Sequence, residues 1–338
     1  MNFSRTVCCQ KTVRGRRRPG NLFTKCVRFI ALVQIIVFAR KYTSTKYANP
    51  FMPSGRPFPI AQPLPAPLSL HIPMNTLPTP VSPFLDLAHA LADAARVHSL
   101  RYFRTPLDVL TKADESPVTI ADREAEAAMR AVLRAQAPTH GILGEEHGRE
   151  RLDAEYVWVI DPIDGTKSFI TGSPLWGTLV ALLHQGRPVL GLMDLPVLGE
   201  RWTGLAGQLT QCNGQPVRAS RCEQLAQARI YTTSPDAFGA ADWQRFDALS
   251  RQCALRRFGG DCYAYAQLAG GHVDLVVEAG LQPYDYLSLV CLVEGAGGRI
   301  TDWQGRALTV ASDGRVVAAA TPQLHAQALD QLAETAIA

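Results

Sequence analysis

Residues 156–169 read YVWVIDPIDGTKSF, and this stretch decides how the rest of the chain is interpreted. Its first five residues are aromatic or aliphatic, and mostly β-branched, which predicts a short buried strand. Pro162 and Gly165 then bend the chain. Asp161 and Asp164 are therefore expected to share one tight turn at the end of a buried strand.

Two carboxylates on one turn repel each other, so they need a cation or a strong set of hydrogen-bond donors to remain ionised. Hard divalent ions such as Mg²⁺ accept an oxygen-only environment. A helix beginning at Thr166 would also point backbone N–H groups outward, which favours phosphate. The alternative for Asp161 and Asp164 is an Asx-turn followed by a helix N-cap, both common uses of aspartate.

Three further groups of acidic residues can also be interpreted either as metal-site residues or as ordinary structural acids. Glu145 follows a glycine and a short apolar stretch, Asp122 stands at an expected helix start, and Glu278 and Asp285 bracket a short turn. Each has an ordinary structural alternative: a solvated acidic pair, an N-cap, or acids at a strand end and a helix start.

Taken together, GEE at 144–146, DPIDGT at 161–166 and PYDY at 283–286, with an acid seven residues before its aspartate, resemble the inositol monophosphatase family. These are metal-dependent, lithium-sensitive phosphatases. The resemblance covers about residues 84–335. It implies an α/β (α+β) fold, a layered αβαβα sandwich.

The resemblance also implies a metal site with two to three Mg²⁺ ions. A first ion would be held by Glu145, Asp161 and the backbone carbonyl of Ile163. A second would be held by Asp161, Asp164 and Asp285, and Glu145 would also touch a third, more weakly held ion.

By the same resemblance, Gly165 and Thr166 would hold the phosphate through backbone N–H groups. Thr166, oriented by Asp122, and Glu145 would position and activate the attacking water. A phosphoryl transfer of this kind needs mainly positioning and positive charge, and no phosphoenzyme is required.

Departures from a typical inositol monophosphatase point to the histidinol-phosphatase branch. DGT is followed by Lys-Ser-Phe, Tyr284 replaces the usual Trp, and Asp261 stands where a small neutral residue is common. Histidinol phosphate carries an ammonium group and an imidazole, which Asp261 and Glu278 could pair with as substrate-binding residues.

We therefore expect hydrolysis of L-histidinol phosphate, a step of histidine biosynthesis. The alternative is an inositol monophosphatase or another small-molecule monophosphatase of the same family. A different class, a non-catalytic metal-binding regulatory relative, is the second alternative.

The first part of the chain differs sharply in charge from the rest. Twelve of the 34 basic residues lie in residues 1–85, which contain no Asp or Glu, so the remainder holds 22 basic against 30 acidic residues. An acidic body argues against a nucleic-acid partner. We expect residues 1–83 to be a basic, Pro-rich disordered extension or a mis-called start, 84–220 an N-terminal subdomain and 221–338 a C-terminal one that completes the site.

The apolar run at 29–39 has eleven residues, too few for a helix that spans a bilayer. We expect no stable membrane span, a cytoplasmic enzyme and, from the resemblance, a homodimer. An organelle transit peptide or a signal peptide is the alternative for the basic segment.

The eight cysteines include no C-x-x-C pair, which indicates free thiols in a reducing compartment. Cys212 and Arg218 match the bare C-x5-R spacing of cysteine phosphatases. However, Asn213-Gly214 lies between them and favours a hairpin turn.

Hydrophobic periodicity in the body predicts alternating helices and strands. Helices are expected at about 84–103, 122–136, 241–252, 262–270, 284–297 and 322–336. Strands are expected at 156–160, 176–184, 189–195, 229–233, 254–258, 273–278 and 314–320.

Overall fold

The computed structural model describes residues 82–106, 109–111 and 117–334. Our predictions for the basic segment, including the apolar run at 29–39, lie outside these residues. None of the described helices is long and apolar enough to cross a membrane.

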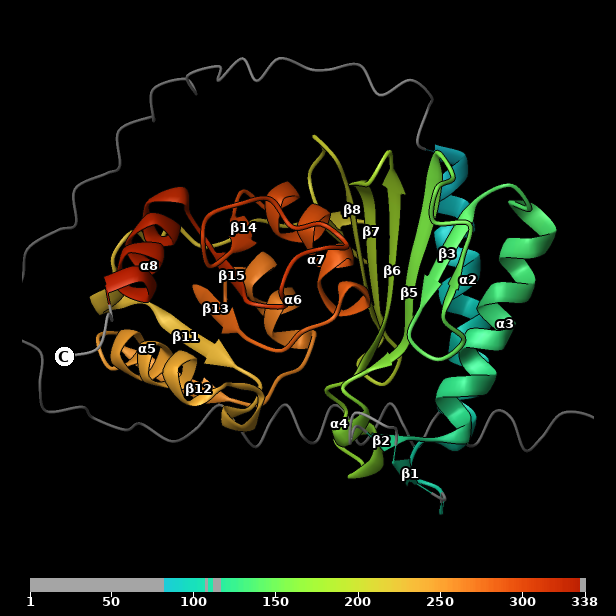
Figure 1. The fold of residues 1–338 in the computed structure, drawn as a ribbon, viewed down its shortest axis with the longest axis horizontal. Coiled ribbons are helices and arrows are strands. Elements are labelled where there is room, and N and C mark those ends of the chain that lie inside the picture. Colours follow the sequence, from blue (N-terminus) through green and yellow to red (C-terminus); the bar gives the residue numbers. More distant parts are fainter. Residues whose placement is uncertain (1–81, 107–108, 112–116, 335–338) are drawn as a thin grey trace, which may run out of the picture. The chain divides into compact units, whose positions relative to one another are not determined.

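The described residues form five layers, helix–sheet–helix–sheet–helix (Figure 1). Two long helices cover the outer face of an eight-stranded sheet, and two helices lie between this sheet and a five-stranded one. Two more helices cover the far face of the second sheet. This arrangement confirms the predicted αβαβα sandwich.

The first sheet has the strand order β10-β9-β8-β7-β6-β5-β3-β4 and is antiparallel except where β3 pairs with β5. Its strands are β3 (Gly141–Gly144), β4 (Arg149–Glu150), β5 (Tyr156–Asp164), β6 (Gly177–His184), β7 (Arg187–Leu195), β8 (Glu200–Leu205), β9 (Gln211–Cys212) and β10 (Gln215–Pro216). A separate small pair joins β1 (Leu110–Thr111) to β2 (Pro117–Val118).

Tight two-residue turns join two pairs of strands in this sheet, one central and one at its edge. Gln185 and Gly186 between β6 and β7 have φ of +50° and +77°, and Asn213 and Gly214 between β9 and β10 have +49° and +76°. Positive φ at both central residues is what a two-residue hairpin requires. The hairpin predicted for the C-x5-R segment is thus confirmed, with Cys212 at the end of a strand.

The second sheet has the order β12-β11-β13-β15-β14, in which β11 is parallel to both of its neighbours. Its strands are β11 (Arg229–Thr232), β12 (Leu255–Phe258), β13 (Leu275–Glu278), β14 (Arg299–Asp302) and β15 (Val316–Ala319). Short 3-10 helices η1 (Leu225–Gln227) and η2 (Pro235–Ala237) flank β11.

The helices divide among the three helical layers. The outer layer on the first sheet is α2 (Ser82–Tyr102) and α3 (Ile120–Gln136), and the middle layer is α6 (Tyr263–Ala269) and α7 (Pro283–Gly295). The last layer is α5 (Ala240–Ser250) and α8 (Pro322–Glu334), and the short α4 (Thr166–Ile170) follows β5.

The middle helix α7 lies directly on the first sheet, because two glycines allow its backbone to approach. A Cβ at Gly191 on β7 would lie 1.9 Å from the carbonyl oxygen of Ser288, and one at Gly204 on β8 would lie 2.5 Å from that of Cys291. Since α7 is covered on several sides, its sequence is apolar nearly all round. This contact fixes where the start of α7 meets the first sheet.

The predicted helices match the structure to within a few residues, but the strands β1 to β4, β8 and β14 were not predicted as strands. The strand predicted at 156–160 also runs on to Asp164. The division expected near residue 220 stays a prediction; residues 217–224 connect the two sheets.

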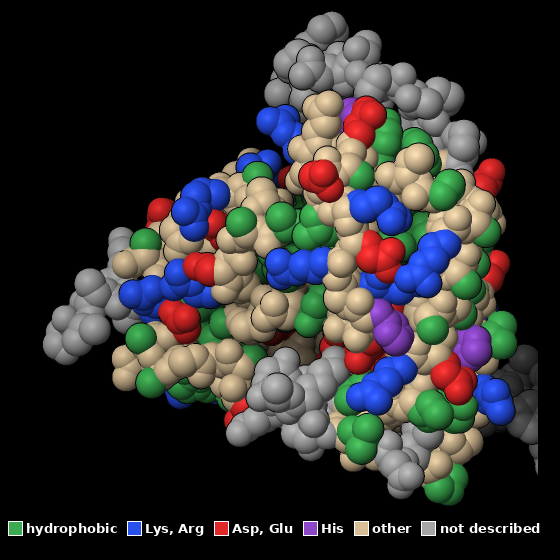
Figure 2. Space-filling model, turned by 45° about the vertical axis from the view of Figure 1, so that its right-hand side comes forward, with side chains coloured by type: hydrophobic (Ala, Val, Ile, Leu, Met, Phe, Trp, Pro, Cys, Tyr) green, Lys and Arg blue, Asp and Glu red, His purple; other side chains and the backbone are tan. Residues whose placement is uncertain are grey.

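The five cysteines among the described residues are all free thiols, as expected for that part of the chain. On the face drawn in Figure 2, the basic side chains are interspersed with acidic ones.

Candidate active site

Asp161 and Asp164, both in β5, meet Asp285 of α7 at one end of the first sheet. One carboxylate oxygen of each of Asp161, Asp164 and Asp285 lies within 4.8 Å of the other two. Asp161 is 1% exposed, and the other two are partly buried. Chain positions more than a hundred residues apart therefore build one acidic cluster.

A bulge in β5 brings the first two aspartates together. Asp161 pairs with Leu179 of β6, but Asp164 pairs with Gly177, so β5 holds one more residue than β6 over this interval. The buried hydroxyl of Thr178 donates to the carbonyl of Pro162 at 2.8 Å and fixes the bulge from the neighbouring strand. A bulge of this kind redirects side chains, which explains why β5 accommodates Pro162.

Asp285 reaches the cluster from the first turn of α7. Pro283 occupies the start of this helix, and the carboxylate of Asp285 accepts the backbone N–H of Gln282 at 2.7 Å. Asp285 therefore also has the structural role considered for it as an alternative, that of an acidic residue at a helix start. The same side chain caps the helix and enters the cluster.

The electrostatics of the cluster are unfavourable without a cation. Burial raises the pKa of Asp161 well above its usual range, and the charges of Glu145, Asp164 and Asp285 raise it further. Burial also raises the pKa of Asp164 to about 7, with a further contribution from Asp261. The backbone N–H of Cys262, 2.7 Å from Asp164, acts in the opposite direction.

The donor set fits a hard divalent cation. The three side chains that converge are all carboxylates, and such ions prefer oxygen ligands. The carbonyl of Ile163, also a predicted ligand, accepts the Thr166 hydroxyl at 3.2 Å, while the Ile163 N–H donates to Asp161 at 2.9 Å.

Glu145 lies in the short loop between β3 and β4 and faces the same region. Its charge raises the pKa of both Asp161 and Asp122. The charge of Glu145 thus acts on the aspartate cluster, and its role as a metal ligand stays a prediction.

Asp122 is fully buried in the first turn of α3. Its Oδ2 accepts the N–H of Thr119 at 2.8 Å and the Thr119 hydroxyl at 2.6 Å. The N-cap residue is therefore Thr119, and Asp122, which the sequence offered as an N-cap, is instead the third helical residue of a capping box. Its Oδ1 is buried without a hydrogen-bond partner. The Thr166 hydroxyl donates to the carbonyl of Ile163 at 3.2 Å and does not bond to Asp122 in this structure. The expected orientation of Thr166 by Asp122 stays a prediction.

Gly165 opens α4 with φ of +83°, a left-handed conformation that favours glycine. A Cβ at this position would lie 2.9 Å from both Cβ and Cγ of Asp261. Asp261 itself has φ of +46°, and its Oδ2 accepts the Ser168 hydroxyl at 2.6 Å. The structure therefore places Asp261 against the DGT turn.

Glu278 lies at the end of β13 and is 1% exposed. Its Oε1 accepts the Thr233 N–H and hydroxyl, both at 2.8 Å, and its Oε2 accepts the Thr232 hydroxyl at 2.9 Å. Burial raises its pKa to about 7, and the hydrogen bonds oppose that shift. Direct contact between Glu278 and a substrate stays a prediction, and it requires this carboxylate to exchange one of these partners.

The sequence interpretation missed two charged residues that contact the loop of Glu145, namely Glu126 and Arg130. Both are buried on α3 and paired at 2.7 Å, and Glu126 also accepts backbone N–H groups of the loop that carries Glu145. Their i, i+4 spacing was the available signal, but such pairs are usually solvent-exposed on a helix surface.

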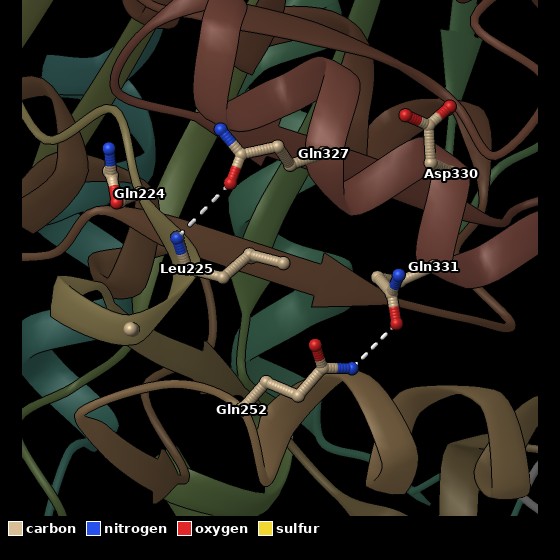
Figure 3. Close-up of a pocket in the computed structure, with 7 residues that line it drawn as sticks. Gln224, Leu225, Gln252, Gln327, Asp330 and Gln331 are labelled. Carbon is tan, nitrogen blue, oxygen red and sulfur yellow. Dashed lines mark hydrogen bonds between the residues drawn. The ribbon is translucent and has the colours of Figure 1, made fainter.

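Two surface hollows lie away from the cluster. One, of about 460 Å³, is lined mainly by glutamines: two from α8, one that follows α5 and one that precedes η1. The side-chain amides of Gln252 and Gln331 hydrogen-bond to each other across it (Figure 3). The other, of about 450 Å³, is lined by Arg96, Arg201 and neighbouring polar residues. Neither contains a residue of the acidic cluster.

Comparison with known proteins agrees with this geometry. The model of the inositol monophosphatase family matches residues 81–336. The chain belongs to the inositol monophosphatase family. Members of this family are metal-dependent phosphatases that act on small phosphate esters.

Individual members of the family are also similar to this chain. It is 46% identical over 274 residues to the bifunctional phosphatase IMPL2, chloroplastic, of Arabidopsis thaliana, covering 78% of this chain and 79% of the relative. It is 36% identical to a histidinol-phosphatase of Chlorobaculum parvum, covering 70% and 93%. A solved inositol monophosphatase of Zymomonas mobilis is 46% identical with a TM-score of 0.70, covering 75% of this chain and 99% of that one.

Proposed function

We propose that this chain is a Mg²⁺-dependent histidinol-phosphatase, which hydrolyses L-histidinol phosphate to L-histidinol and phosphate in histidine biosynthesis. The observation that carries the hydrolase part is the convergence of Asp161, Asp164 and Asp285 on one point, with Glu145 beside it. The similarity to the Chlorobaculum histidinol-phosphatase supports the choice of substrate.

In this proposal, the metal ligands are Glu145, Asp161, Asp164, Asp285 and the carbonyl of Ile163. When bound there, two to three Mg²⁺ ions would supply positive charge for the phosphate and make water a better nucleophile at neutral pH. The raised pKa values of the aspartates have the same physical origin as this affinity, since a cation offsets their mutual repulsion.

The residues of this chain then have separate tasks. Gly165 and Thr166 hold the phosphate through backbone N–H groups. Glu145 accepts a proton from the attacking water as the new P–O bond forms. The ester P–O bond breaks, and the leaving alkoxide takes up a proton from a solvent water and departs as the alcohol. Asp122, with its unpartnered Oδ1, assists in positioning this water together with Thr166.

Asp261 supplies the preference for a cationic substrate. Its carboxylate lies against the DGT turn and is fixed by Ser168, so it is close to the bound phosphate. The ammonium group of histidinol phosphate would gain a charge-assisted hydrogen bond from Asp261. The uncharged ring of an inositol ester would gain less from a desolvated carboxylate.

The test is phosphate release from L-histidinol phosphate and from myo-inositol 1-phosphate, with Mg²⁺ and with EDTA. We expect a higher kcat/KM for the histidinol ester and loss of activity in EDTA that added Mg²⁺ restores. Asp161→Asn should lower the rate by orders of magnitude on both esters. Near-normal turnover by this variant would refute the site, whereas preference for the inositol ester would overturn only the substrate.

Inositol monophosphatase activity is the second candidate, favoured by the 46% identity to the Zymomonas inositol monophosphatase. A non-catalytic metal-binding regulator is the third. A folded protein that binds Mg²⁺ but releases no phosphate from any small ester would support that class.

The location in the cell also stays a proposal. Our expectation is the cytoplasm, but the Arabidopsis relative is named chloroplastic, which supports import into an organelle. Mass spectrometry of the natural N-terminus, together with the size of the primary translation product, separates the two: translation that starts at Met74 excludes a targeting role for the basic segment, whereas a longer product that is cut back supports one. A homodimer is proposed from family resemblance, and size-exclusion chromatography with light scattering tests it.

A further inference from the structure

We propose that Glu126 is a positioning residue that sets the affinity of the site for Mg²⁺ by holding the backbone of the loop that carries Glu145. This inference rests on the proposed function, because it concerns the same metal site. It assigns a role to a buried charged residue that the reaction itself does not use.

The first observation is how Glu126 contacts this loop. Its Oε2 accepts the N–H of Glu146 at 2.6 Å, and its Oε1 accepts the N–H of His147 at 3.1 Å. Both donors follow Glu145 directly in the chain. One carboxylate therefore fixes two consecutive peptide groups next to the proposed metal ligand.

The second observation is the close packing of Glu126 against the start of the loop. A Cβ at Gly144 would lie 2.2 Å from Oε1 of Glu126, so only glycine allows this approach. The loop closes on itself through a hydrogen bond from the Gly144 N–H to the carbonyl of Gly148 at 3.0 Å. Its entry and its middle are thus both defined by α3.

Arg130, one turn further along α3, contacts both Glu126 and the same loop. Its Nε donates to Glu126 at 2.7 Å, its Nη2 donates to the carbonyl of Gly148 at 2.5 Å, and its Nη1 donates to Glu150 at 2.8 Å. Glu126 and Arg130 are 0% and 2% exposed. A buried ion pair of this kind often adds little to the free energy of folding. We therefore assign it a role in fixing the position of the loop.

The hydrogen bonds between Glu126 and the loop matter because Glu145 is close to other negative charges. Its carboxylate lies beside Asp161 and Asp122, and without a cation these groups repel one another. The repulsion would move a flexible loop away from the cluster. Because Glu126 holds the loop backbone, the Glu145 ligand stays in place and ion binding does not have to order it.

The test is Glu126→Gln, which keeps the size of the side chain. The amide offers one acceptor oxygen, so at least one loop N–H or the Arg130 Nε loses its partner, while Arg130 keeps Glu150 and the Gly148 carbonyl. We expect the Mg²⁺ Kd, measured by isothermal titration calorimetry, to rise about tenfold or more. The half-activating Mg²⁺ concentration should rise in parallel, and KM for the phosphate ester at saturating Mg²⁺ should stay within about twofold.

Asp274→Asn is the matched control. Asp274 is also a buried carboxylate with an arginine partner, Arg229 at 2.7 Å, but it precedes β13 at the end opposite Glu278. We expect it to lower the urea midpoint without changing the Mg²⁺ Kd. A purely structural role for Glu126 predicts the same pattern for both variants.

An unchanged Mg²⁺ Kd in folded Glu126→Gln would overturn the inference and leave the proposed function intact. Absence of Mg²⁺ binding by the wild-type chain would instead overturn the proposed function. If Glu126→Gln does not fold, Glu126→Asp keeps the charge beside Arg130 but withdraws the carboxylate from the loop by one methylene. The same rise in Mg²⁺ Kd is expected for it, and an unchanged value refutes the inference.

Discussion

Replacement of Gly165 by alanine tests how tightly the DGT turn packs against Asp261. The substitution has two separate effects. Alanine must adopt φ of +83°, and its Cβ must occupy a point 2.9 Å from Cβ and Cγ of Asp261. Asp261 has little freedom to withdraw, because it is itself left-handed and its carboxylate is held by Ser168 at 2.6 Å.

The two effects have different magnitudes. The left-handed conformation costs about 1–2 kcal/mol for a residue with a Cβ. Forcing the neighbouring chain to shift costs about 1–3 kcal/mol more, as overpacking of a filled site does. We therefore expect Gly165→Ala to lower the free energy of unfolding by about 2–5 kcal/mol in total.

Gly186→Ala separates these two effects. Gly186 has φ of +77°, but nothing lies within 4 Å of the position that its Cβ would take. It therefore carries only the conformational penalty, about 1–2 kcal/mol. The difference between the two variants measures the contact with Asp261.

Urea denaturation of both variants in EDTA gives the two free energies of unfolding, and phosphate release with Mg²⁺ gives the activities. We expect Gly165→Ala to lose activity far beyond Gly186→Ala, because Asp261 and the phosphate-binding turn must both move. Equal losses of stability and equal activities in the two variants would refute the close packing of this turn.

Two further predictions concern groups outside the acidic cluster. Buried Asp194 accepts Arg96 at 2.6 and 3.0 Å and Arg201 at 2.8 Å, whereas Asp93, 66% exposed, pairs with the same Arg201. In urea denaturation, Asp194→Asn should therefore cost about 3–5 kcal/mol and Asp93→Asn at most about 1 kcal/mol; equal losses would contradict this. Burial lowers the pKa of His325 to about 4, so between pH 6.5 and 4 the unfolded chain binds one more proton at this residue than the folded chain. This contribution to stability falls by about 1.4 kcal/mol per pH unit as the pH is lowered through that window, about 3 kcal/mol in all. The variant His325→Gln should lack this contribution. The difference in free energy of unfolding between the wild type and this variant should therefore decrease as the pH is lowered from 6.5 to 4. A difference that stays constant over this range would contradict the assignment.

The local parts of the fold follow closely from the sequence. Hydrophobic periodicity predicted the long helices to within a few residues, and Asn213-Gly214 predicted a hairpin that the structure contains. The end of β5 was not predicted, because Pro162 indicates a strand end unless a bulge absorbs it. Thr178 of the adjacent strand stabilises that bulge, and a pattern within β5 alone does not show it.

The candidate site was predicted in part. The chemistry of Asp161 and Asp164 is visible in one short stretch, and the family resemblance connected it with Glu145 and Asp285. The hydrogen bonds of the site were not predicted. The Thr166 hydroxyl, for example, donates to the carbonyl of Ile163 rather than to Asp122. Such choices depend on angles and distances of an ångström or less, which residue identity does not fix.

By itself, the sequence determined the periodic elements, the turns that need positive φ and the types of ligand atom available for a cation. These properties depend on local sterics and on side-chain chemistry, and both are carried by neighbouring residues. Only the tertiary structure decided that Glu126 and Arg130 are buried beneath the loop of Glu145, and that α7 places Asp285 beside β5. Burial and convergence arise from the packing of whole layers against one another, so no single segment of the chain contains them.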